Sequence, residues 1–169
     1  MDVDISITSA DWSTSPDIAA TIERAARMAV SVGAPAAEAD AELSILLASD
    51  AFVRGLNHRY RGRDSATNVL SFPQKSPGRN GARGLLGDIA LAYETVAREA
   101  RAAGKPLEHH AAHLVVHGVL HLFGYDHDDD TKAAQMEERE RAILFALGIP
   151  DPYAHDEAPT EPAKVSPAP

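Results

Sequence analysis

The most informative stretch of this sequence is HGVLHLFGYDH, residues 117–127, in which three histidines surround a glycine. His117 and His121 are four residues apart, so they share one face if this stretch is helical. Gly124 follows three residues later, and glycine readily takes the positive φ that ends a helix and turns the chain back. That return can bring His127 to the same point. Three imidazoles around an open position are typical of a catalytic zinc site, so the spacing predicts a metal centre.

The spacing His-x3-His-x5-His, with its glycine, matches the zinc-binding helix of metzincin proteases. These proteases carry a glutamate directly after the first histidine as their general base. Here that position is Gly118, which has no side chain to accept a proton. The sequence therefore predicts a metzincin-like metal-binding helix and leaves a metalloprotease-like hydrolase as an alternative that Gly118 opposes.

Other polar residues near this stretch are weaker candidates for a role at the metal centre. His113 lies one turn before His117, and we expect it to support the metal ligands or to pack. His109 and His110 fall near the start of the expected helix, where we expect them to be solvated. Asp126 is a candidate for orienting a histidine ring, as carboxylates often do around metals.

Length and composition predict a single domain with a real core. The chain has 169 residues and no cysteine, which excludes disulfide partners and thiolate metal sites. Its N-terminus lacks a basic-then-apolar signal pattern, and no apolar run approaches the roughly 20 residues needed to cross a bilayer. We therefore expect a cytoplasmic protein with no membrane contact.

The charge distribution is uneven. A net charge of −9 argues against indiscriminate nucleic-acid binding. Between residues 54 and 83, however, seven basic residues face a single acid, Asp64. The seven are Arg54, Arg59, Arg61, Arg63, Lys75, Arg79 and Arg83. A basic segment in an acidic chain that also carries a metal site favours an anionic, phosphate-bearing substrate. Aromatic residues make up only 5% of the chain, so we expect base stacking to be limited.

Hydrophobic periodicity predicts an α/β (α+β-like) domain. Strands are expected over residues 2–8, 42–47, 68–72 and 86–92. Helices are expected from Pro16 to Gly33, after a cap at Ser49 or Asp50, and over residues 93–104, 106–123 and 130–148. This order predicts a small mixed sheet of about four strands packed with five or six helices. Residues 1–150 form the expected domain, and residues 151–169, rich in Pro, Ala and acids, form an expected disordered tail.

Three segments together resemble the YbeY family of bacterial endoribonucleases. They are the histidine stretch, the block LNHRYRGRDSATNVLSFP at residues 56–73, and LGDI at residues 86–89. The resemblance implies that His117, His121 and His127 are the metal ligands and that Arg61, of the Tyr-Arg pair, is catalytically important. It also implies a four-stranded sheet with the metal site in a cleft.

By the same resemblance, the protein would be a single-strand-specific, metal-dependent endoribonuclease in ribosomal RNA maturation, including small-subunit 3′-end processing, and in ribosome quality control. Implied partners are the ribosomal RNA precursor, the small ribosomal subunit, and assembly factors such as the Era GTPase. One divalent metal is expected per chain, zinc first, although Ni²⁺, Fe²⁺ or Co²⁺ suits three imidazoles as well. A third alternative is a non-catalytic ribosome-assembly factor with a structural metal. The general base is unassigned.

Overall fold

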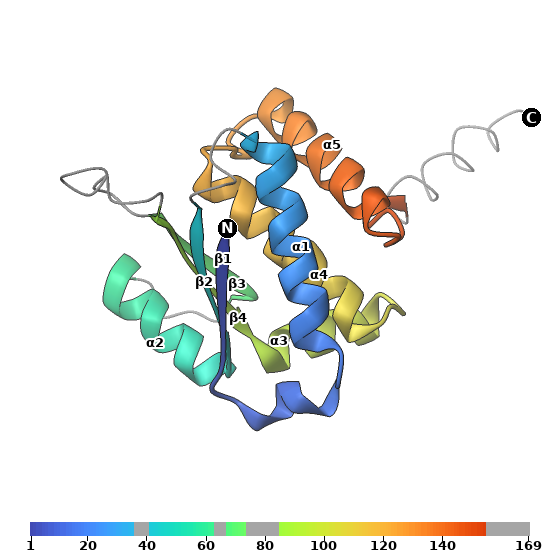
Figure 1. Ribbon diagram of the computed structural model, residues 1–169. Helices are drawn as coiled ribbons and strands as arrows, with labels where there is room; N and C mark the ends of the chain where they lie inside the picture. Colours follow the sequence, from blue (N-terminus) through green and yellow to red (C-terminus); the bar gives the residue numbers. More distant parts are fainter. Residues whose placement is uncertain (36–40, 63–66, 74–84, 155–169) are drawn as a thin grey trace, which may run out of the picture.

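The computed structural model describes residues 1–35, 41–62, 67–73 and 85–154. Within these ranges the chain forms four strands, five α-helices and one short 3-10 helix (Figure 1). The strands are β1 (Asp2–Ile7), β2 (Glu42–Ala48), β3 (Val69–Pro73) and β4 (Leu85–Ala92). The helices are η1 (Ala10–Thr14), α1 (Ile18–Gly33), α2 (Asp50–Arg61), α3 (Tyr93–Ala102), α4 (Leu107–Leu122) and α5 (Asp130–Ala146).

The strands form one mixed sheet in the order β1-β2-β4-β3. Strands β1, β2 and β4 run parallel, and β3 pairs antiparallel with β4. The predicted small mixed sheet of four strands is therefore confirmed, as is the α/β class. Strand β3 lies at the sheet edge, so one row of its backbone groups faces away from β4.

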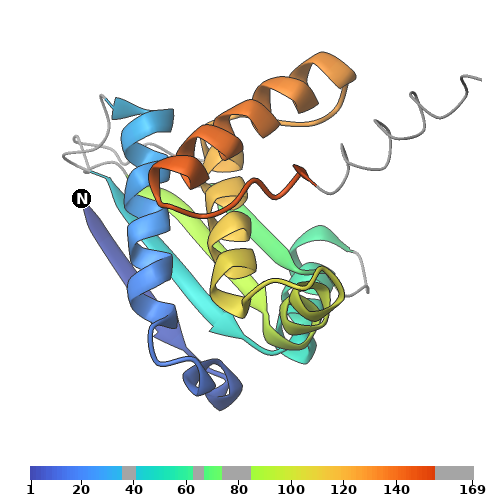
Figure 2. The same cartoon turned by 90° about the vertical axis from the view of Figure 1, so that its right-hand side faces the viewer.

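Helices cover the two faces of the sheet unequally. Helices α1 and α4 lie side by side on one face, α5 crosses over them, and α2 lies on the opposite face (Figures 1 and 2). Strand β2 shows why the α1 and α4 face holds the core, because Leu43, Ile45 and Leu47 are buried at alternate positions. Trp12 closes one end of this core, and its Nε1 donates to the carbonyl of Ala48 at 2.9 Å.

One helix start differs from the sequence-based expectation, and another decides between two expected caps. Helix α1 begins at Ile18, two residues after Pro16, because the hydroxyl of Ser15 is engaged with the carboxylate of Glu108 on α4 and caps no amide of α1. At α2 the cap is Ser49, whose Oγ accepts from the Phe52 amide at 3.2 Å. Asp50 instead accepts two hydrogen bonds from Thr95 of α3 and so fixes α2 to α3.

The described chain continues past α5 to residue 154, and Tyr153 packs back against α5 and α4. The rest of the expected tail, residues 155–169, lies outside the described residues, so its disorder stays a prediction. Across the described ranges, no helix combines the length and the apolar character that a membrane span requires.

Candidate metal centre

The three predicted histidines meet at the C-terminal end of α4. His117 and His121 lie one turn apart on this helix, which ends at Leu122. Gly124 then takes a φ of 92°, and its amide donates to the carbonyl of His121 at 3.0 Å. The turn reverses the chain, as the glycine predicted, and returns His127 to the side of the helix that carries the other two rings.

The geometry of these three side chains suits one metal ion. One candidate ligand nitrogen from each ring lies within 4.8 Å of the other two. The Nε2 atoms of His117 and His121 are 3.0 Å apart. A tetrahedral zinc ion with bonds of about 2.0–2.1 Å holds its ligand nitrogens about 3.4 Å from one another, so small ring adjustments suffice. The donor set therefore fits a divalent cation with a remaining open position.

Glu140 of α5 fixes the orientation of His117. Its side chain has 0% exposure, and His117 Nδ1 donates to its Oε1 at 2.5 Å. Burial alone would raise the pKa of Glu140, but hydrogen bonds from His113 and His117 outweigh burial and lower the pKa to about 2. A proton on Nδ1 leaves the Nε2 lone pair of His117 directed toward the other histidines, which is the tautomer that a metal ligand requires.

Sequence reasoning missed Glu140 and proposed Asp126 for this role instead. Asp126 accepts from the Asp128 amide at 3.2 Å and lies 3.8 Å from Lys132, so it stabilises the turn, and it has no hydrogen bond to a histidine ring within the described ranges. A signal for Glu140 was nevertheless available. It shares the buried face of α5 with Met136, Ile143 and Leu144, where a lone carboxylate needs a polar partner.

Two further histidines of α4, His113 and His110, contact carboxylates of neighbouring helices. His113 Nε2 lies 3.1 Å from Glu140 Oε2, so His113 supports the same carboxylate as His117. The expectation that His110 is solvated is wrong. His110 is buried where α4 meets α3, with Nε2 3.0 Å from Glu99 Oε1, and burial lowers its pKa. Its position near the helix start does not expose it, because α3 covers that end of α4.

Electrostatics keep His121 in the neutral form. Burial lowers the pKa of His121, and the neighbouring rings of His117 and His127 lower it further. A neutral imidazole retains the lone pair that binds a metal, whereas a protonated one cannot bind. The environment of His121 thus favours the ligating state.

Arg61 and the three histidines line the same pocket, of about 500 Å³. It is the last residue of α2, and its Nη2 donates to the carbonyl of Ser71 on the exposed edge of β3 at 2.7 Å. Its guanidinium also lies 5.7 Å from the ring centre of Phe72. Among the described residues no carboxylate pairs with Arg61, so its charge is not neutralised by a salt bridge there. The pocket is also lined by Thr67, Asn68, Val69, Ser71 and Pro73.

Part of the predicted basic segment can be placed. Arg54, Arg59 and Arg61 are exposed on α2, which leads toward the pocket. Arg63, Lys75, Arg79 and Arg83 lie outside the described residues. The described part of the segment thus places one arginine, Arg61, in the pocket of the three histidines.

Gly118 marks a close approach between α4 and the sheet. A Cβ atom there would lie 3.0 Å from Ser71 Oγ and 3.1 Å from Ile89 Cδ1. A glutamate at this position would therefore clash with β3 and β4. Packing opposes the metzincin arrangement here as well as residue type does.

Comparisons with known proteins place the chain in a family. Residues 5–148 match the family model described as endoribonuclease YbeY. Relatives of that name include a protein of Rhodopseudomonas palustris, 51% identical over 148 residues, with 85% of this chain and 76% of the relative covered. Another, from a Bradyrhizobium species, is 49% identical over 150 residues, with 86% and 88% covered. The solution structure of the Thermotoga maritima protein TM1509 has a similar fold, with a TM-score of 0.55, 21% identity, and 86% and 91% of the two chains covered.

Proposed function

The chain belongs to the YbeY family of endoribonucleases, and we propose that its three-histidine pocket is the centre at which it cleaves RNA. One observation supports this assignment above all others. The three histidines that suit a metal ion and Arg61, which has no carboxylate partner among the described residues, line the same pocket. A metal ion and a guanidinium in one cavity suit a phosphodiester.

In this proposal His117, His121 and His127 bind one divalent ion, with zinc as the first candidate and Ni²⁺, Fe²⁺ or Co²⁺ as the others. When bound, such an ion polarises a phosphoryl oxygen and lowers the pKa of water. Glu140 holds His117 in the ligating tautomer. Arg61 binds the non-bridging oxygens of the scissile phosphate, where a planar guanidinium matches two oxygens at once.

The proposed substrate is single-stranded RNA of the ribosomal RNA precursor, including the 3′ end of the small-subunit RNA. Proposed partners are the small ribosomal subunit and assembly factors such as the Era GTPase, and the proposed setting is the cytoplasm, with a role in ribosome quality control. These assignments rest on the family resemblance. We further propose that residues 1–150 form the catalytic domain and that the acidic tail of residues 151–169 is largely outside it.

A parallel activity assay tests the central proposal. Zinc-loaded wild-type protein is incubated with ribosomal RNA precursor and with casein, beside His121→Ala and Arg61→Ala. We expect RNA cleavage by the wild type only and no casein cleavage. His121→Ala should lose bound metal, measured by elemental analysis, whereas Arg61→Ala should keep it. Cleavage of casein, or unchanged RNA cleavage by both variants, would contradict the proposal.

The same proteins separate a catalytic metal from a structural one. If the ion only holds the fold together, His121→Ala should unfold the protein. If the site is catalytic, His121→Ala should lose cleavage while its circular dichroism spectrum and melting curve stay close to wild type, because His121, unlike His117, is not a hydrogen-bond partner of the buried Glu140. His109→Ala is a matched control, because it removes an imidazole from the opposite end of α4 and should keep both metal and activity.

A further inference from the structure

A second groove adjoins the metal pocket on the other face of the sheet. It measures about 880 Å³, within the range of ligand-binding clefts, and lies between α2 and the sheet. Arg61, Ser71 and Pro73 line both cavities. The two therefore meet at the edge strand β3, where the Ser71 side chain points toward α4 and Phe72 points into the groove.

Aromatic side chains gather along this groove. Tyr60 is 64% exposed, and its ring meets that of Phe72 edge-on with centroids 5.5 Å apart. Phe52, 47% exposed, lies further along the same groove. Three of the nine aromatic residues of the chain thus line one cleft next to the candidate metal site. Exposed rings beside a cationic side chain are the usual platform for unpaired bases.

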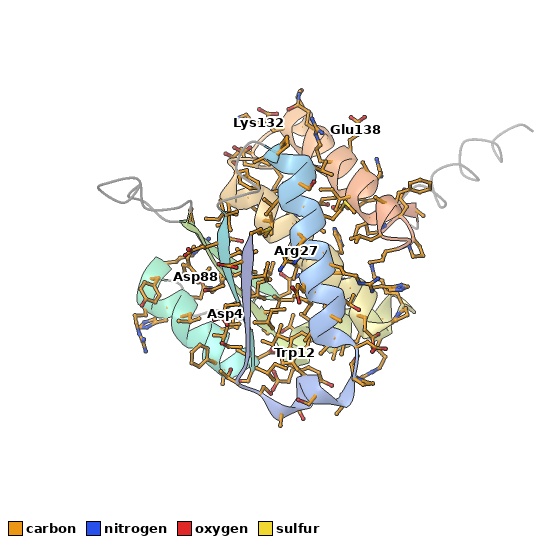
Figure 3. All side chains as sticks on the ribbon, viewed as in Figure 1. Asp4, Trp12, Arg27, Asp88, Lys132 and Glu138 are labelled. Carbon is orange, nitrogen blue, oxygen red and sulfur yellow. The ribbon has the colours of Figure 1, made fainter. Side chains whose placement is uncertain are left out.

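One row of side chains on the floor of the groove is polar and acidic, among apolar neighbours such as Leu46 and Ala90. Strand register places Asp4, Ser44 and Asp88 in one row across β1, β2 and β4, with Phe72 next to Asp88 on β3. Figure 3 shows Asp4 and Asp88 on the side of the sheet that faces α2. Within the described part of the chain, neither carboxylate has a hydrogen bond or an ion pair with another residue. Phosphate groups are repelled from such a floor, whereas groups that donate hydrogen bonds are attracted.

We propose that this groove binds an unpaired guanine base of the RNA strand, within one or two nucleotides of the scissile phosphate. This inference rests on the proposed function, since the strand must cross β3 at Arg61 with a phosphate in the metal pocket. Tyr60 and Phe72 contact the base through their rings. Guanine is the only common base whose Watson–Crick edge has two adjacent donors, N1–H and the N2 amino group, and a carboxylate such as Asp88 accepts both.

The test uses uridine heptamers that carry one central guanosine, incubated with the zinc-loaded full-length protein. We expect wild type to cut within two nucleotides of the guanosine and to cut all-uridine heptamers more slowly, at scattered positions. Replacing guanosine with inosine, which lacks the N2 amino group, should weaken this focus. Cleavage of the guanosine strand at positions unrelated to the guanosine would overturn the proposal.

Three variants identify the residues involved. Tyr60→Ala should raise the KM for the guanosine strand roughly fivefold to 100-fold, the range expected for loss of one stacked base. Tyr60→Phe should stay near wild type, because the ring is kept. Asp88→Asn should remove the preference for guanosine over uridine, because an amide has one acceptor atom for the two donors of guanine. The matched control is Phe145→Ala, which removes an 84% exposed ring from α5 on the opposite face of the sheet and should change nothing.

These outcomes distinguish a failure of the groove proposal from a failure of the proposed RNA cleavage. If the wild type cleaves none of the strands, the proposed RNA cleavage fails and the groove proposal fails with it. If the wild type cleaves RNA but Tyr60→Ala and Asp88→Asn keep its KM and cleavage pattern, the groove proposal alone is wrong. Such a result would indicate that the groove takes a partner other than the RNA strand. Unchanged melting curves and zinc content in the variants exclude loss of folding as the cause.

Discussion

At the scale of single residues, the candidate centre depends on a carboxylate as much as on its three histidines. Glu140 accepts hydrogen bonds from His113, His117 and Tyr153 while fully buried. A buried charge is tolerated only when it has such partners. One of these partners, His117, is itself a candidate metal ligand, so the carboxylate determines which nitrogen of His117 carries the proton.

Replacing Glu140 with glutamine should therefore weaken metal binding. The amide keeps the size of the side chain but loses the charge that holds the Nδ1 proton of His117. We expect the zinc affinity to fall about tenfold or more, the range seen when groups that support metal ligands are removed. Competition with a chromogenic chelator measures this. Glu138→Gln, on the exposed face of α5 (Figure 3), is the control and should bind zinc like the wild type. Equal affinities for all three proteins would show that Glu140 does not position His117.

The three histidines and Glu140 differ in how far sequence alone predicts their roles. His117, His121 and His127 are close in sequence, and helix periodicity with one glycine turn is enough to bring them together. Glu140 comes from another helix, and its contact with His117 depends on how α5 crosses α4, which local spacing does not encode. Its position on a buried helix face predicts that it has a partner but does not identify that partner.

At the scale of elements, α4 carries the site because it lies directly on the sheet. Gly118 is a point of close approach, and Ile89, which a new Cβ atom would press on, has 0% exposure. The helix therefore cannot move outward for a larger residue without opening the core. The same contact joins the helix that carries the histidines to β3, the strand that holds Arg61 through the carbonyl of Ser71.

Gly118→Glu should accordingly destabilise the protein and should not create a protease. Overpacking of a filled core costs about 1–3 kcal/mol, and the buried carboxylate adds to this. Gly55→Glu is a matched control, since a Cβ atom at Gly55 on α2 would meet no other atom within 4 Å. That variant should be as stable as wild type or up to about 1 kcal/mol more stable, because glycine is a poor helix former. Urea denaturation measures both, and a Gly118→Glu protein that is as stable as Gly55→Glu would contradict the packing argument.

Most elements were predictable because each has a local signal. The period-two pattern of β1, the cap at Ser49 and the glycine after α4 all lie within a few residues of the structure they specify. The order of the strands was not predictable in this way. Strand β4 lies between β2 and β3 because both of its long-range pairings bury apolar residues, and that choice depends on the whole chain.

At the scale of the whole molecule, buried polar contacts join the helices into one unit and make its stability depend on pH. His110 of α4 and Asn68, just before β3, both contact the carboxylate of Glu99 on α3. His110 is buried, and its Nδ1 has no hydrogen-bond partner among the described residues. A second proton on this ring is therefore unfavourable in the folded state, because burial outweighs the attraction of the Glu99 carboxylate.

Stability should consequently fall as the pH drops below about 6.5, the pKa of an unfolded histidine. Burial lowers the pKa of His110 in the fold, so between the two pKa values the unfolded chain binds a proton that the folded chain does not. The stabilisation is present above pH 6.5 and is lost as the pH falls toward the folded value. Urea denaturation at pH 7.5, 6.5 and 5.5 should show that the free energy of unfolding falls less for His110→Gln than for wild type. An equal fall for both proteins would contradict this role for His110.

The C-terminal segment adds a further connection to the buried carboxylate. After α5 the chain returns to Glu140, where the hydroxyl of Tyr153 donates to Oε2 and its ring packs edge-on against His113 at 5.5 Å. Arg141 holds the segment by a 3.3 Å ion pair with Asp151 and lies 5.1 Å from the centre of the Tyr153 ring. Composition predicts a tail from residue 151 and gives little reason to place a residue of that segment against the metal centre. The aromatic Tyr153, amid Pro, Ala and acids, is the only local hint.

Tyr153→Phe should therefore weaken zinc binding, although this residue contacts no candidate ligand. The variant removes one donor to Glu140, the carboxylate that orients His117, so we expect a loss of roughly threefold to tenfold, smaller than that for Glu140→Gln. Tyr93→Phe deletes the same hydroxyl from a ring packed against Trp12, far along the chain from the histidines, and should leave zinc affinity unchanged. Chelator competition on both proteins decides the matter. If the two variants bind zinc equally well, the C-terminal segment only covers the buried carboxylate; if Tyr153→Phe alone binds more weakly, the metal centre extends from α4 through α5 to residue 153.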